Sequence, residues 1–235
     1  MNFFEGIIDG LYRTFVVDNR YQIFLQGLSN TLIITICSAI IGVILGTAVA
    51  ICKTYHTQTG KLKFLDRILS LYLTVFRGTP IMVQLLIWAF VVFASVKNEL
   101  PVAIFAFGIN SGAYVAETVR AGILAVDKGQ TEAGRSLGLT SGATMRFIVL
   151  PQAFKNILPA LSNEVIALLK ETSIVGYIAI IDLTKAADLV RARTFDAFLP
   201  LFSVAMIYLA LVILLTFGQR CLERRLGTDD KGKKS

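Results

Sequence analysis

The feature that most constrains this chain is a long uncharged run near its start. Nothing from Tyr21 to Cys52 carries a charge, and the run is bounded by Arg20 and Lys53. A transmembrane helix needs about 20 mostly apolar residues, so the run is long enough to cross a bilayer. The 235 residues are 55% hydrophobic and only 17% charged, whereas about 25% is usual in soluble domains. The sequence therefore predicts an all-α integral membrane protein and excludes a soluble enzyme, a disordered chain and a disulfide scaffold.

Further apolar stretches follow the first, and together they predict five transmembrane helices. These five predicted spans are Tyr21 to Cys52, Ile68 to Val96, Leu100 to Val119, Phe154 to Ile181, and Ala197 to Gln219. The chain would then consist of an extracytoplasmic N-terminal segment (1–22), a five-span transmembrane domain (23–219) and a basic cytoplasmic tail (220–235). We expect it to be a multi-pass protein of the cell membrane, in contact with lipid.

Lysine and arginine are unevenly distributed over the connecting segments. Most of the 23 Lys and Arg residues are found in three stretches, 53–67, 120–155 and 220–235. Cytoplasmic loops of membrane proteins carry an excess of these residues, so the pattern predicts an N-terminus outside and a C-terminus inside. It also accounts for the net charge of +7 without a nucleic-acid partner. The three cysteines lack the spacing of metal ligands, and we expect no metal site.

The predicted cytoplasmic loop at about residues 127–151 contains an informative motif. It reads GQTEAGRSLGL from Gly129 to Leu139 and continues to IVLP, which ends at Pro151. We expect a short helix that begins near Thr131 and ends at Gly138, because glycine is the usual residue in the left-handed position after a helix. An ordinary connecting loop is the alternative.

This loop resembles the EAA motif of permease subunits of ATP-binding-cassette (ABC) importers. The positions in register with that motif are Glu132, Ala133, Gly138, Ile148, Leu150 and Pro151. Gly134 departs from it, because a second alanine is usual there. In that family the motif forms a coupling helix that contacts a cytoplasmic ATPase. The resemblance implies that the ATPase-docking residues are Glu132, Ala133, Gly134, Arg135, Leu137 and Gly138.

Three other stretches resemble the histidine/glutamine/arginine/cystine branch of the type I importers. They are FRGTP at 76–80, SGAYVAE at 111–117 and PALSNE at 159–164. The resemblance implies that two permease subunits, identical or homologous, pair over two ATPases, and that an extracytoplasmic binding protein delivers a polar amino acid. The sequence has no G-x-x-x-x-G-K-[ST] phosphate-binding loop. We therefore expect that this chain is not an enzyme and binds no cofactor itself, and that the partner ATPases bind ATP and Mg²⁺.

Charged residues at membrane depth are costly and usually face a polar interior or another charge. Apart from Lys155, which is counted with the preceding cytoplasmic loop, the charged residues of the predicted spans are Arg77, Glu117, Glu164, Lys170 and Glu171. Arg77 lies beside a Gly-Thr-Pro run at 78–80, where we expect a break in the helix. Asn110, Tyr114 and Glu117 are spaced by four and three residues, so they share one helix face. A local ion pair of Glu117 with Arg120 is the structural alternative to a substrate role for Glu117.

An amino acid carries an ammonium and a carboxylate, so its site should offer an acidic group and a basic or NH-rich group. The predicted substrate-binding residues are Glu164, Glu117, Asn163, Ser111, Tyr114, Thr79 and Arg77. The surplus of acidic groups favours a cationic side chain such as that of arginine, lysine or histidine, while glutamine, glutamate and cystine stay open. Two alternatives remain: a passive channel or membrane scaffold without ATP coupling, and an importer whose permease has no specific substrate site.

Overall fold

The computed structural model describes residues 3–226, and every regular element within them is helical. The α-helices are α1 (Phe3–Leu11), α2 (Tyr21–Thr59), α3 (Lys63–Gly78), α4 (Ile81–Ile87), α5 (Glu99–Leu124), α6 (Lys128–Ser136), α7 (Ser141–Thr144), α8 (Leu150–Glu171), α9 (Leu183–Thr194) and α10 (Phe198–Leu226). Short π-helical and 3-10 segments extend several of them. The all-α class predicted from the sequence is confirmed. Most of the predicted basic tail lies outside the described residues.

Within residues 3–226, three helices are long and apolar enough to cross a membrane by themselves, and these are α2, α5 and α10. They begin within one residue of the predicted first, third and fifth spans. Each continues beyond the apolar run, as α2 does to Thr59, because a helix ends where its backbone is stopped and not where its composition changes. At α2 the stop is Gly60, which has a left-handed φ of 67°.

The predicted second span, Ile68 to Val96, is not one continuous helix. It is divided between α3 and a second helical stretch, Ile81–Val92, made of α4 and the π-helical segment that follows it. The chain bends by 109° between the two, and only together are they apolar and long enough to cross a membrane. Pro80 lies at the break, and Thr79 before it is extended, with φ −123° and ψ 147°. A proline disfavours helical backbone in the preceding residue and donates no hydrogen bond. The uninterrupted hydropathy of the segment therefore conceals a sharp bend.

The predicted fourth span, Phe154 to Ile181, also differs from the structure. Its helix, α8, begins earlier, at Leu150, and ends at Glu171, where a 3-10 segment, Thr172–Ile178, takes over. In the described chain, α8 is not among the helices that are long and apolar enough to span a membrane by themselves. The count of five spans therefore stays a prediction.

The core of the bundle is the contact between α2 and α5. A Cβ atom at Gly42 would lie 2.6 Å from Ser111 Oγ, and one at Gly46 would lie 2.6 Å from Val115 Cβ. The two glycines therefore let the helix backbones approach more closely than any other residue would allow. Buried side chains beside this contact join α2 and α5 to α4, α8 and the 3-10 segment, among them Ile34, Leu85, Phe107, Leu168 and Val175.

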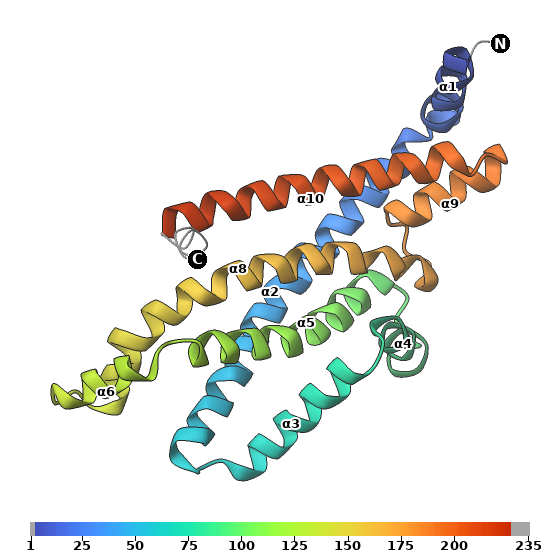
Figure 1. Cartoon of the computed structure of the whole chain (residues 1–235). Coiled ribbons are helices and arrows are strands. Elements are labelled where there is room, and N and C mark those ends of the chain that lie inside the picture. Colours follow the sequence, from blue (N-terminus) through green and yellow to red (C-terminus); the bar gives the residue numbers. More distant parts are fainter. Residues whose placement is uncertain (1–2, 227–235) are drawn as a thin grey trace.

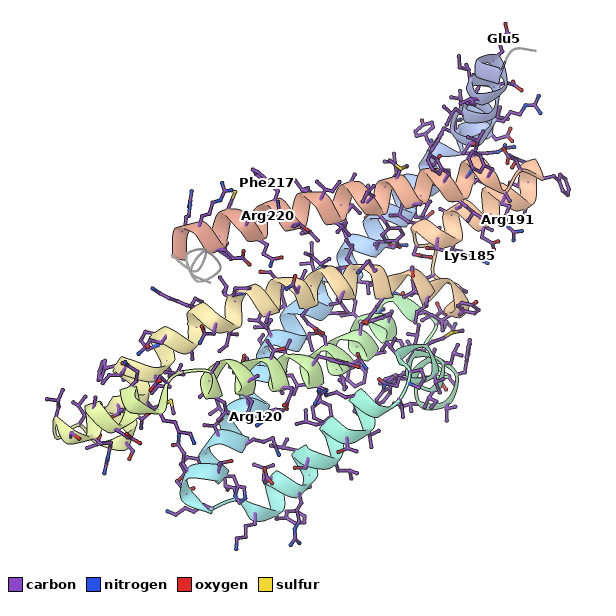
Figure 2. The ribbon with its side chains drawn as sticks, viewed as in Figure 1. Glu5, Arg120, Lys185, Arg191, Phe217 and Arg220 are labelled. Carbon is purple, nitrogen blue, oxygen red and sulfur yellow. The ribbon has the colours of Figure 1, made fainter. Side chains whose placement is uncertain are left out.

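The connecting segments are sorted between two ends of the bundle (Figure 1). The α2–α3 connection, α6 and the C-terminal end of α10 lie toward the left of the view, whereas α1, α4 and α9 lie toward the right. Figure 2 shows Arg220 on the left part of α10 and Lys185 and Arg191 on α9 at the right. The described parts of the three stretches richest in Lys and Arg are thus at the same end, an arrangement consistent with the predicted topology.

Candidate substrate path and coupling surface

Three of the predicted substrate residues come together where α3 ends. Arg77 is the last residue but one of α3, and its Cζ lies 5.7 Å from the centroid of the Tyr114 ring. Its Nη1 lies 3.8 Å from Glu117 Oε2. The Arg77 side chain is still 42% exposed and that of Glu117 is 28% exposed. A guanidinium over an aromatic face, with a carboxylate beside it, forms a polar group that a small zwitterion could reach.

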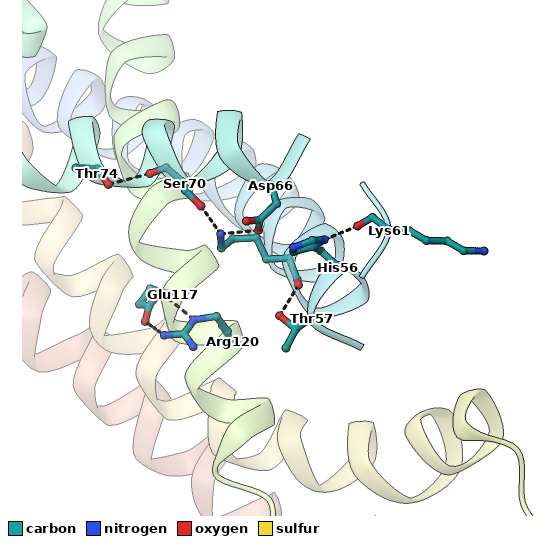
Figure 3. Close-up of polar contacts among 9 residues, drawn as sticks. His56, Thr57, Lys61, Asp66, Ser70, Thr74, Glu117 and Arg120 are labelled. Atoms are coloured by element: carbon teal, nitrogen blue, oxygen red, sulfur yellow. Dashed lines mark hydrogen bonds and ion pairs between the residues drawn. The ribbon is translucent and has the colours of Figure 1, made fainter. Parts of the chain in front are cut away.

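Glu117 has a second and closer cationic neighbour on its own helix. Arg120 Nε donates to Glu117 Oε2 at 3.1 Å, and Arg120 Nη2 also contacts the other carboxylate oxygen (Figure 3). The local ion pair that was the structural alternative is therefore present. An ammonium group would have to compete with two guanidinium groups for Glu117, so the cluster is better suited to receive a carboxylate at Arg77.

A second polar network lies on the same side of the bundle and ties α2 to α3. Lys53 Nζ donates to Asp66 Oδ1 at 2.8 Å and to Ser70 Oγ at 2.7 Å (Figure 3). The hydrogen bond from Lys53 holds the pKa of Asp66 below its ordinary value. This network was not predicted from the sequence, because its members are separated by a turn and belong to different helices. It fixes the hairpin formed by α2 and α3.

The break between α3 and α4 contains buried amides that the sequence analysis did not assign to the site. Gln84 and Asn110 are 7% and 4% exposed. Thr79 lies at the break and is exposed, and its hydroxyl donates to the Val75 carbonyl at 2.8 Å and accepts from Gln84 Nε2 at 2.8 Å. The Thr79 hydroxyl thus takes part in closing the break.

The other predicted substrate residues lie elsewhere on α5 and α8. Ser111 is 2% exposed and lies against Gly42 of α2, and its Oγ has no hydrogen-bond partner in residues 3–226. On α8, Asn163 is exposed and Glu164 is half-buried. Within the described chain, none of the seven ion pairs includes Glu164. One copy of the chain therefore does not join the seven predicted residues by direct polar contacts.

The predicted coupling helix is α6, and it begins earlier than expected. The Asp127 side chain accepts from the Gly129 N–H at 2.6 Å and caps the helix, so the start near Thr131 was wrong. An aspartate before a helix is a standard N-cap and was the signal available. The predicted end is right: Gly138 has a left-handed φ of 85°, and the N–H of Leu139 bonds the Gly134 carbonyl at 3.1 Å.

The docking residues predicted on α6 face two different ways. Gly134 is buried, and a Cβ atom there would lie 2.8 Å from side-chain atoms of Ile148 and of Thr144. The departure from the EAA pattern therefore lets α6 pack closely on the segment that returns to α8. The other five residues are exposed, and the largest apolar one, Leu137, is 81% exposed. They are Glu132, Ala133, Arg135, Leu137 and Gly138.

Residues 38–228 match the family described as the binding-protein-dependent transport system inner membrane component. The chain is 42% identical over 209 residues to the arginine transport system permease protein ArtQ of Bacillus subtilis, a match that covers 88% of this chain and 93% of that protein. It is 40% identical over 207 residues to a putative glutamine transport system permease protein GlnP of Rickettsia bellii, covering 86% and 91% of the two chains.

A solved structure described as an amino acid ABC transporter with histidines superposes with a TM-score of 0.81 at 41% identity. That match covers 90% of this chain and 98% of the other. These similarities confirm the resemblance to importer permeases that the motifs in the sequence indicated, and they support a membrane location. The chain belongs to the family of inner membrane components of binding-protein-dependent transport systems.

Proposed function

We propose that this chain is the permease subunit of an ABC importer that moves polar amino acids into the cytoplasm. The observation that carries the proposal is α6: a short helix, capped at both ends, that exposes most of its motif residues at the basic end of the bundle. Such a helix is suited to insert into a partner protein. The named functions of the two relatives, in arginine and in glutamine transport, support an amino-acid substrate.

The proposed topology has five spans, with the N-terminus outside and α6 in the cytoplasm. In chain order the proposed spans are α2, the bent pair α3–α4, α5, α8 and α10. The location of the basic segments at one end of the bundle supports this orientation. A charged helix such as α8 can cross a bilayer when its polar face is covered by protein.

The proposed assembly contains two permease subunits, two cytoplasmic ATPases and an extracytoplasmic binding protein. The half-exposed Arg77 and the half-buried Glu164 support a second permease, because neither polar group can face lipid cheaply. The exposed residues of α6 would contact the ATPase, which would bind ATP and Mg²⁺. Movement of the ATPases would then be transmitted through α6 to the spans, and the substrate path would open alternately to the two sides of the membrane.

The proposed substrate site combines Arg77, as the ligand of the substrate carboxylate, with Glu164, as the partner of a cationic side chain. The polar residues around them would be Thr79, Ser111, Tyr114, Glu117 and Asn163. The proximity of Arg77 to Tyr114 and Glu117 supports the first half of this site. An importer without a specific site in its permease is the competing arrangement, and it predicts that substitutions at both positions leave substrate preference unchanged.

The test is uptake by the chain reconstituted in liposomes with its ATPase and binding protein. Labelled arginine, histidine, lysine, glutamine, glutamate and cystine are supplied with ATP, with a non-hydrolysable analogue, or without nucleotide. The proposal expects concentrative uptake of at least one of them with ATP alone. Equal uptake under all three conditions would instead identify a passive channel.

A further inference from the structure

The break between α3 and α4 deprives one backbone carbonyl of its helical partner. In a continuous helix the Phe76 carbonyl would accept from the N–H of the residue four positions later. That residue is Pro80, which has no N–H. Two side-chain amides replace it: Gln84 Nε2 donates to the Phe76 carbonyl at 2.9 Å and Asn110 Nδ2 at 3.1 Å. An unpaired carbonyl is costly at membrane depth, so this replacement has a clear physical reason.

The two amides are also joined to each other and to Thr79. Asn110 Nδ2 donates to Gln84 Oε1 at 3.0 Å. Gln84 Nε2 lies 3.0 Å from the Thr79 carbonyl and 2.8 Å from Thr79 Oγ1. We call Gln84, Asn110 and their acceptors on Phe76 and Thr79 the amide clamp. Its two amide side chains are buried, and they connect α3, α4 and α5 at one point.

The amide clamp lies directly beside Arg77. Because Phe76 precedes Arg77, fixing the Phe76 carbonyl fixes the last turn of α3, from which the guanidinium extends. Tyr114 and Glu117 follow Asn110 on α5 by four and seven residues, so all three lie on one helix face. On that face Asn110 bonds the Phe76 carbonyl. The Tyr114 ring centroid lies 5.7 Å from Arg77 Cζ, and Glu117 Oε2 lies 3.8 Å from Arg77 Nη1.

We infer that Gln84 and Asn110 are positioning residues, which hold the bent end of α3 so that the Arg77 guanidinium stays over Tyr114, ready for the carboxylate of an amino acid. The binding of a substrate carboxylate rests on the proposed function, whereas the positioning of Arg77 by the amide clamp does not. Both amides act through the backbone of α3. A clamp that only stabilised the fold would leave the effects of Gln84 and Arg77 on transport independent of each other.

The geometric part is tested on the full-length chain, without any transport measurement. The three native cysteines are replaced by serine, Arg77→Cys and Tyr114→Cys are introduced, and a short bifunctional thiol reagent joins the pair. Gln84→Met keeps the length of the side chain and removes its donors. It is expected to lower the cross-linking yield about fivefold or more, because the end of α3 is released. An unchanged yield overturns the inference.

A matched control loses an amide–carbonyl bond elsewhere in the fold. Asn30 Nδ2 donates to the Ile181 carbonyl at 2.9 Å, between α2 and the segment before α9. Asn30→Leu is expected to leave the cross-linking yield within about twofold of the parent, because distant sites act independently. Where Gln84→Met gives no monodisperse protein, Asn110→Ala is used with the same expected loss. An equal loss of yield in the Asn30 control would show that the loss comes from general destabilisation of the fold, and it would overturn the inference.

The functional part is a double-mutant cycle on ATP-dependent uptake of labelled arginine by the reconstituted complex. Gln84→Met should raise KM about tenfold with kcat within about threefold, and in an Arg77→Met background it should change KM by less than about twofold. The inference is overturned if the KM changes of Gln84→Met and Arg77→Met multiply in the double variant. It is also overturned if Arg77→Met alone leaves KM unchanged. A wild-type complex without ATP-dependent uptake contradicts the proposed function instead, and the cross-linking result then decides the clamp.

Discussion

The conformation of Gly138 provides a sharp test of how α6 is built and used. Its φ is 85°, and nothing lies within 4 Å of the place that a Cβ atom would occupy, so a substitution meets backbone strain and no crowding. This conformation supports two bonds that close the helix: Gly138 N–H to the Arg135 carbonyl and Leu139 N–H to the Gly134 carbonyl, at 3.0 and 3.1 Å. The left-handed conformation costs a residue with a Cβ about 1–2 kcal/mol. Gly138→Ala should therefore open the last turn of α6 about 5- to 30-fold more often.

Two measurements follow this opening: hydrogen exchange at the Leu139 amide, and the affinity of the reconstituted permease for its ATPase. The exchange rate should rise by that factor, whereas the affinity should fall only as far as the closed fraction of α6 falls, if the ATPase binds the closed form. Gly142→Ala is the matched control, because Gly142 is helical and also has nothing within 4 Å of its Cβ position. Gly138→Asn should lose less than Gly138→Ala, because asparagine tolerates the left-handed region. Wild-type exchange and affinity in Gly138→Ala would refute the reasoning.

Three further predictions concern other parts of the fold. The hydrogen bond from Lys53 lowers the pKa of Asp66 in the folded protein, so the stabilisation by this ion pair is complete above the unfolded pKa of 3.8 and is lost as the pH falls through the folded pKa. The thermal midpoint of the wild type should therefore fall more steeply below about pH 4 than that of Asp66→Asn. Gly46→Leu places a Cβ 2.6 Å from an α5 side chain and should cost about 1–3 kcal/mol or more in thermal unfolding, whereas Gly218→Leu, in open space, should cost little. Glu164→Gln should reduce uptake of arginine more than that of glutamine; equal losses would indicate a structural carboxylate.

The parts of the fold that the sequence predicted are those governed by long apolar runs. α2 and α10 begin at or next to the predicted residues, Tyr21 and Ala197, because an uncharged run of this length has few alternatives to a spanning helix. A break at Gly78-Thr79-Pro80 was predicted from these residues, but the sharpness of the bend was not, because average hydropathy is insensitive to one missing N–H. The end of α8 was missed for a related reason: Thr172–Ile178 is as apolar as a helix but winds as a 3-10 segment.

The candidate site was predictable only where its residues share one helix. The face formed by Asn110, Tyr114 and Glu117 follows from their spacing, and all three do contact the end of α3. The partner of Gln84 could not be predicted, since a buried amide is satisfied by groups that the fold brings together from distant parts of the chain. The inward direction of Gly134 was missed in the same way, because it depends on the packing of the returning segment.

The two guanidinium groups at Glu117 differ in how firmly they are held, and this difference bears on the proposed mechanism. Arg120 contacts both carboxylate oxygens, whereas Arg77 reaches only one, at 3.8 Å, beyond normal hydrogen-bond distance. A substrate carboxylate that took over Arg77 would therefore replace a weak contact and leave Glu117 paired with Arg120. No buried charge would lose its partner in the exchange, which is the main cost of breaking ion pairs away from water. On the proposed function, Arg120 thus makes Arg77 available: Arg120→Gln should draw Arg77 onto Glu117 and raise KM for arginine, whereas an unchanged KM would mean that Arg77 does not bind the carboxylate.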